Sequence, residues 1–174
     1  MIAPSLWSSR RPHVGWFDWI IHGDPRGGLI KVSCSEVYDP CPEIVRWMDD
    51  IAASRFPAKL KIDEEGKHVR FSIAPVPERP EWAELEIIRD FESGPKGPPP
   101  KLIFFTRVRP QQLVAQFLRR WTDWLSQDYV AKEWHQFHWT DDMDAAYRDR
   151  VADPATLDIT VLEQFVSNER SRGE

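Results

Sequence analysis

The chain has 174 residues, of which 41% are hydrophobic and 29% are charged, and its formal net charge is −5. These values are typical of one globular domain and exclude a disordered chain. No apolar run approaches the roughly 20 residues of a membrane helix, and the first residues lack the apolar segment of a signal peptide. We therefore expect a cytoplasmic protein without membrane contacts.

The predicted elements begin with a loose polar arm over residues 1–12, which is followed by a single domain over 13–174. The first part of this domain, 16–109, is rich in strand patterns, and the last part, 110–170, is rich in helix patterns. Apolar and polar residues alternate with the period of a β-strand in several short runs of the first part. Six strands are expected, over 16–22, 29–37, 59–62, 68–74, 84–91 and 101–109.

Both cysteines lie near the second of these strands. Cys34 shares a strand face with Ile30 and Val32, so it is interpreted as a small buried hydrophobic residue. Cys41 lies between two prolines. Because the sequence shows no secretory signal, both thiols are expected to be reduced rather than joined.

The clearest helix falls within 39–56, where apolar residues recur at the spacing of one helical face. These residues are Ile44, Val45, Trp47, Met48, Ile51 and Ala52. The proline-rich segment 75–82 is expected to be a crossing loop. A long amphipathic helix is expected over 110–128, and shorter helices are expected over 129–138, 141–152 and 158–170.

A run of strands that is bracketed by helices predicts an α+β fold. We expect one antiparallel sheet of about six short strands. The amphipathic helix after the second strand and the C-terminal group of helices should pack against this sheet.

Eight of the nine tryptophans of the chain fall into two classes. Trp47, Trp121 and Trp124 lie on apolar helical faces, and Trp19 lies on a covered strand, so these four are expected in the core. The four tryptophans of the second class have polar or irregular surroundings, where an exposed indole would suit an interface. These are Trp7, Trp82, Trp134 and Trp139.

Two features suggest chemistry, and each has a structural explanation. The loop 22–28 is rich in glycine but lacks the Gly-Lys-Ser/Thr ending of a phosphate-binding loop, so it is interpreted as a hairpin turn. His135 and His138 have a spacing that suits metal ligands on a helix, but the aromatic residues around them favour packed or solvated histidines. We expect no metal and no cofactor, and the catalytic residues, if there are any, stay unknown.

Charge is unevenly distributed along the chain. The segment 93–122 contains no acidic residue, whereas acidic residues exceed basic ones from 128 to the end. The net negative charge argues against direct nucleic-acid binding. An alternative is that the acidic part imitates a phosphate backbone and inhibits a nucleic-acid-binding partner.

The segment 32–75 resembles a recurring arrangement in small bacterial proteins of unknown function. A strand, an amphipathic helix and a hairpin with an acidic glycine turn follow one another in VSCSEVYDPCPEIVRWMDDIAASRFPAKLKIDEEGKHVRFSIAP. In size, acidity and tryptophan content the chain is also similar to immunity proteins that neutralise polymorphic toxins. This resemblance implies stoichiometric binding of a partner protein.

The preferred hypothesis is therefore a non-enzymatic bacterial module that binds and inhibits another protein, such as a toxin or a nuclease. Tryptophan anchors with a rim of carboxylates would form its interface, and the candidates are Trp134, Trp139, Asp141, Asp142 and Asp144. The alternative is a small-molecule-binding protein or a hydrolase-like enzyme. Its pocket would lie between sheet and helices, lined by Trp16, Trp19 or His22 and approached by Arg26.

Overall fold

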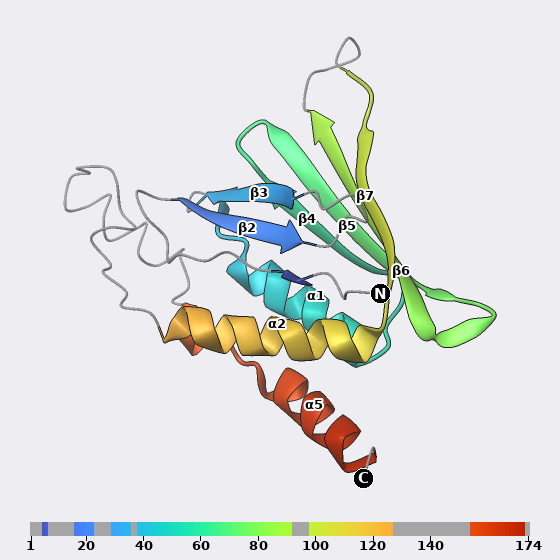
Figure 1. Cartoon of the computed structure of the whole chain (residues 1–174). Coiled ribbons are helices and arrows are strands. Elements are labelled where there is room, and N and C mark those ends of the chain that lie inside the picture. The colour runs from blue at the N-terminus through green and yellow to red at the C-terminus, as the bar shows by residue number, and fades with distance from the viewer. Residues whose placement is uncertain are drawn as a thin grey trace.

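The computed structural model of the chain describes residues 5–6, 16–22, 29–35, 38–91, 98–126 and 154–172. These residues form an α+β fold with two antiparallel sheets, whereas the sequence predicts a single sheet (Figure 1). The first sheet has the order β1–β2–β3, and the second has the order β4–β5–β6–β7. The strands are β1 Ser5–Leu6, β2 Trp16–His22, β3 Leu29–Ser35, β4 Ala58–Asp63, β5 Lys67–Val76, β6 Arg79–Phe91 and β7 Lys101–Val108.

Strands β2 and β3 pair along their whole length, and their side chains alternate between a core face and an outer face. The pairing runs from Trp16 opposite Ser35 to His22 opposite Leu29. The buried members of the core face are Phe17, Trp19, Ile21, Val32 and Cys34, as the alternation predicts. Within the segment expected to be a loose arm, Ser5 and Leu6 pair with the end of β2.

Strands β4 to β7 form a meander in which each strand pairs with the next one in sequence. The turn between β4 and β5 contains Glu65 with φ 57° and Gly66 with φ 89°. Two positive φ angles are the requirement of a type I′ hairpin turn. The prediction of a crossing loop over 75–82 is wrong, because Val76 pairs with Arg79 and β5 therefore turns directly into β6.

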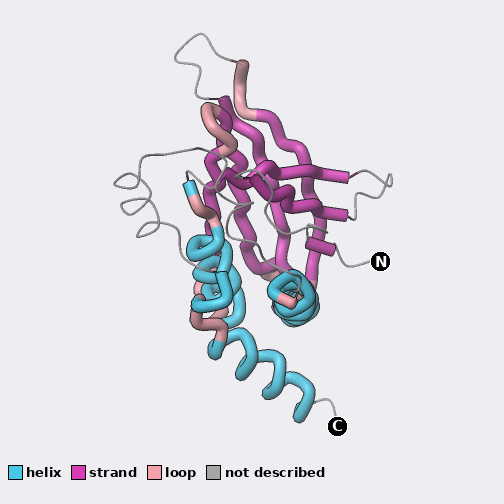
Figure 2. Tube along the Cα trace, turned by 90° about the vertical axis from the view of Figure 1, so that its left-hand side faces the viewer, coloured by secondary structure: helices cyan, strands magenta, loops and turns pink. Residues whose placement is uncertain are grey.

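The described helices are α1 (Cys41–Ala52), α2 (Pro110–Leu125) and α5 (Thr160–Arg172), and a short 3₁₀ turn, Pro154–Thr156, precedes α5. All six residues predicted for the core face of the first helix are buried. Helix α1 contacts β4, α2 and α5, and Figure 2 shows the described helices below and beside the strands. The helices predicted over 129–138 and 141–152 lie outside the described residues. None of the described helices is long and apolar enough to cross a membrane.

Two aromatic clusters fill the core, and each includes one residue of β2. In the first, the ring of Trp19 stacks on Phe71 at 5.0 Å and meets the edge of Trp47 at 6.3 Å, which joins β2 to β5 and α1. In the second, Phe17 lies 5.4 Å from Trp124, which in turn lies 5.2 Å from Trp121 of α2. The four tryptophans predicted for the core are all buried.

Candidate functional site

The structure describes only some of the residues that the sequence predicts for a functional site. The predicted partner-binding residues Trp134, Trp139, Asp141, Asp142 and Asp144 lie outside the described residues, as do Trp7, Arg26, His135 and His138. Trp16 lines a pocket, as the alternative hypothesis predicts. The prediction that Trp19 lines it is wrong, because this ring is fully buried between Trp47 and Phe71.

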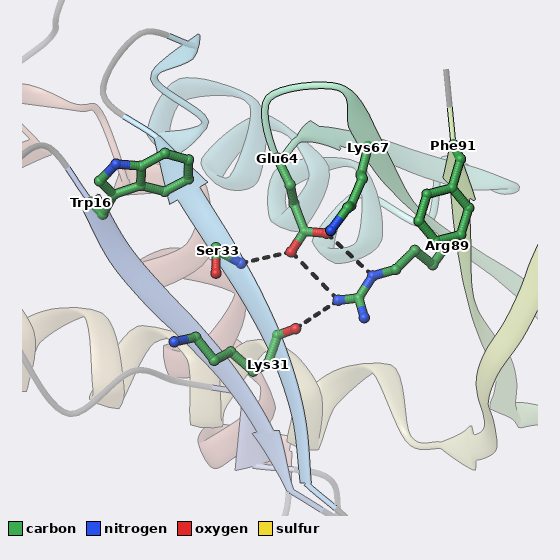
Figure 3. A pocket seen from close by; sticks show the side chains of 7 residues that line it. All are labelled: Trp16, Lys31, Ser33, Glu64, Lys67, Arg89 and Phe91. Atoms are coloured by element: carbon green, nitrogen blue, oxygen red, sulfur yellow. Dashed lines mark hydrogen bonds and ion pairs between the residues drawn. The ribbon is translucent and has the colours of Figure 1, made fainter. Parts of the chain in front are cut away.

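The pocket has a volume of about 540 Å³ and lies where the two sheets meet, rather than between sheet and helices (Figure 3). It is open to solvent. Side chains from β2, β3, β6 and the β4–β5 hairpin line it, and these are Trp16, Lys31, Ser33, Glu64, Lys67, Arg89 and Phe91. A volume between about 300 and 1,000 Å³ is typical of small-molecule sites.

Strand alternation explains why polar groups gather here. Glu64 follows the buried Ile62 by two residues, Lys67 precedes the buried Val69 by two, and Arg89 follows the buried Ile87 by two. Residues two apart on a strand point to the same face. The inner face of the four-stranded sheet is therefore apolar where the helices and the other sheet cover it, and becomes charged beyond that cover.

Glu64 is the centre of the polar contacts, and its side chain is only 9% exposed. Its Oε1 accepts a hydrogen bond of 2.8 Å from the backbone N–H of Ser33. Arg89 lies beside it, with 3.2 Å between Nε and Oε2, and donates from Nη2 to the carbonyl oxygen of Lys31 at 2.8 Å. Side chains thus bind the backbone of β3 at the edge where a further strand would otherwise pair.

The cations of the pocket differ in how far they are neutralised. Arg89 pairs with Glu64, and the ammonium group of Lys31 lies 2.6 Å from Asp18 on the outer face of the first sheet. Lys67 forms no ion pair within the described part of the chain, and its ammonium group lies 5.9 Å from the centre of the Phe91 ring. Lys67 is therefore the cation of the lining that has no acidic partner among the described residues, which favours an anionic ligand.

Sequence reasoning found Trp16 but missed the charged residues of the pocket. In the sequence, Glu64 and Lys67 belong to the acidic glycine turn of the hairpin. The signal that identifies them is the alternation, because each lies two residues from a buried apolar residue, Ile62 or Val69. Their meeting with Lys31 and Ser33 depends on how the two sheets cross, which strand alternation does not determine.

A second feature is the face of the four-stranded sheet that points away from the core. Glu86 lies opposite Phe105 and Ile88 lies opposite Leu102 across β6 and β7. Phe105 and Leu102 are 46% and 53% exposed. We call Ile88, Leu102 and Phe105 the outer apolar patch.

Three arginine side chains in or directly after strands of the same sheet form ion pairs or lie over an aromatic ring. Arg107 donates to Glu84 at 3.0 Å, and the Arg109 guanidinium lies 5.0 Å from the centre of the Trp82 ring. Arg70 lies 3.3 Å from Asp90. The sequence does not determine whether Trp82 is exposed, and in the structure its side chain is only partly exposed.

In comparisons with protein-family models, curated proteins and solved structures, the chain has no significant match.

Proposed function

We propose that this chain is a binding protein whose pocket between the two sheets takes a small anionic ligand. The observation that carries the proposal is that Lys31, Lys67 and Arg89 line one open pocket whose single carboxylate, Glu64, is already paired. Cations held at the rim of a low-dielectric body attract anions more strongly than cations in free solution do.

Lys67 is the group best placed to bind such a ligand. Arg89 and Lys31 each have an acidic partner, whereas Lys67 contacts only the face of Phe91 among the described residues. An incoming anion can therefore pair with Lys67 without displacing a carboxylate. Glu64 has the opposite effect, because its negative charge repels the ligand.

Titration of the isotope-labelled 174-residue chain with inorganic phosphate, followed by amide NMR, tests this proposal. Lys67→Gln should weaken phosphate binding by about tenfold, since a charge-assisted hydrogen bond is lost. Glu64→Gln should strengthen it. Lys59→Gln removes an exposed lysine that does not line this pocket and should leave the affinity unchanged. Phosphate shifts that are absent, or equal in all variants, would rule the site out.

The second candidate function is the binding of a partner protein, as in the immunity-type hypothesis. The observation that favours it is the outer apolar patch, because exposed large apolar side chains that adjoin one another are typical of interaction surfaces. The acidic segment with Trp134 and Trp139 is the other proposed contact.

Co-purification tests the partner hypothesis if the proteins retained by the unaltered 174-residue chain are compared with those retained by its variants. Phe105→Ser should remove a partner that binds the outer apolar patch, and Trp134→Ala should remove one that binds the acidic segment. Val161→Ser alters another exposed apolar residue, on α5, and serves as the matched control. A partner retained by the first two variants would contradict both proposed surfaces.

A further inference from the structure

We infer that the ligand of the pocket is an aromatic phosphate monoester, in which a planar ring stacks on Trp16 and the phosphate pairs with the pocket cations. This inference rests on the anion binding proposed above and specifies the class of ligand. It adds a role for the apolar lining, which anion binding alone does not use.

Trp16 is the tryptophan of β2 that the core does not use. Trp19, on the opposite face of the same strand, is fully buried and packs against two aromatic rings. Trp16 is partly exposed, lines the pocket and contacts no other aromatic ring within the described residues. A partly exposed indole at the wall of a cationic pocket provides a flat surface for a planar ring.

The other ring of the pocket is already occupied. Phe91 has the ammonium group of Lys67 over its face at 5.9 Å. Figure 3 shows Trp16 and Phe91 at opposite ends of the pocket, with Ser33, Glu64 and Arg89 between them. The ring of a ligand therefore stacks on Trp16, and its charged group points towards the cations between the two aromatic ends.

The charge of the lining favours a phosphate over a carboxylate. Lys31, Lys67 and Arg89 oppose only Glu64 among the lining residues. A phosphate monoester carries about −1.5 to −2 charges near neutral pH, whereas a carboxylate carries one. Asp18 pairs with Lys31, so a surplus of about one positive charge remains, and the attraction of a ligand to this surplus grows with the negative charge of the ligand.

The test compares three probes on the isotope-labelled full chain by NMR titration: inorganic phosphate, phenyl phosphate and benzoate. Phenyl phosphate should bind about tenfold more tightly than inorganic phosphate, because stacking on an aromatic side chain adds to the ionic contact. Benzoate should bind more weakly than phenyl phosphate. Equal affinities for the two aromatic probes would overturn the assignment of a phosphate group.

Variants of Trp16 assign the ring contact. Trp16→Leu should reduce the affinity for phenyl phosphate to about that for inorganic phosphate. Trp16→Phe, which keeps a ring, should retain most of the preference for the aromatic probe. Trp82→Leu is the matched control, because Trp82 is also partly exposed but lies outside the pocket.

The outcomes separate this inference from the proposed function. If both phosphates bind equally and depend on Lys67, the anion site stands and the aromatic preference is wrong. If neither phosphate shifts any signal of the pocket residues, both proposals are wrong. If Trp16→Leu does not fold, comparing the probes on the unaltered chain and on Trp16→Phe still shows whether an aromatic ring on the phosphate raises the affinity.

Discussion

Asp49, in the last turn of α1, has a carboxylate oxygen that is buried without a hydrogen-bond partner in the described part of the chain. Burial is the main cause that raises the pKa of Asp49, and the charges of Asp158 and Asp50 add to it, while Arg55 opposes them. The folded chain therefore holds this proton more tightly than the unfolded chain. Ionisation of Asp49 lowers the stability of the fold, and this loss grows as pH rises through the raised pKa.

Asp49→Asn should therefore raise the free energy of unfolding near neutral pH, by less than about 1 kcal/mol. The gain should shrink in acid, below the pKa of an unfolded aspartate, because Asp49 is then protonated in both states. Chemical denaturation at several pH values measures both effects. Asp50→Asn is the control and should bring no gain, since it removes the 2.7 Å ion pair with Arg55. If Asp49→Asn is less stable than the unaltered chain at neutral pH, burial of this carboxylate does not destabilise the fold.

The two cysteines allow a second prediction at the scale of single residues. Both side chains are buried, and burial raises the pKa of Cys34 well above its usual range, with the charges of Glu64 and Asp18 as further causes. Since the thiolate is the reactive form, neither cysteine of the folded chain should react with a disulfide reagent such as Ellman's reagent. Both should react after unfolding in guanidinium. Rapid labelling of the folded protein would show that this part of the core opens.

At the scale of elements, the phase of each strand could be predicted from the sequence, but the pairing of the sheets could not. The inward positions Leu60, Ile62, Val69 and Phe71 are buried as the alternation requires. Alternation tells which face of a strand is apolar, but it does not tell whether β3 pairs with β4. Helix α1 separates these two strands in the sequence. In the structure no ladder pairs them, and the side chain of Glu64, directly after β4, binds the backbone N–H of Ser33 on β3.

The same limit applies to the candidate site. The sequence names Trp16 for a pocket, but it predicts that pocket between sheet and helices, whereas the pocket that Trp16 lines lies where the two sheets meet. Glu64, Lys67 and Arg89 become a site only when the two sheets cross, so no local pattern identifies them as a group. Three charged residues near strand ends are common in any sheet. What distinguishes Glu64 and Arg89 is their ion pair beside β3, in which the Glu64 side chain is only 9% exposed.

The junction of the two sheets leads to a prediction for these elements. Arg89→Met leaves the nearly buried carboxylate of Glu64 with the Ser33 N–H as its remaining described contact. Because an unpaired charge then stays in a place of low dielectric, the free energy of unfolding should fall by about 2 kcal/mol. In the double variant with Glu64→Gln, the loss should be smaller than the sum of the single losses. Additive losses in denaturation experiments would mean that the pair does not connect the sheets.

At the scale of the whole molecule, β2 links all the layers through its inward aromatic residues. Trp19 contacts Phe71 of the second sheet and Trp47 of α1, and Phe17 contacts Trp124 of α2. Each layer thus shares an aromatic contact with the same strand. Such shared packing favours a single cooperative unfolding transition.

Trp19→Ala should therefore destabilise the whole fold rather than one sheet. The loss should be about 3–5 kcal/mol, as expected for a large buried aromatic residue, and fluorescence and far-ultraviolet circular dichroism should keep a common midpoint. Trp19→Phe should cost clearly less, because it keeps a ring against Phe71 and removes an indole N–H that has no described partner. Trp82→Ala, the control at a partly exposed site, should cost about 1 kcal/mol, mainly from its contact with Arg109. Separate midpoints for the two signals would show that the sheets unfold independently, and β2 would then not be the common link.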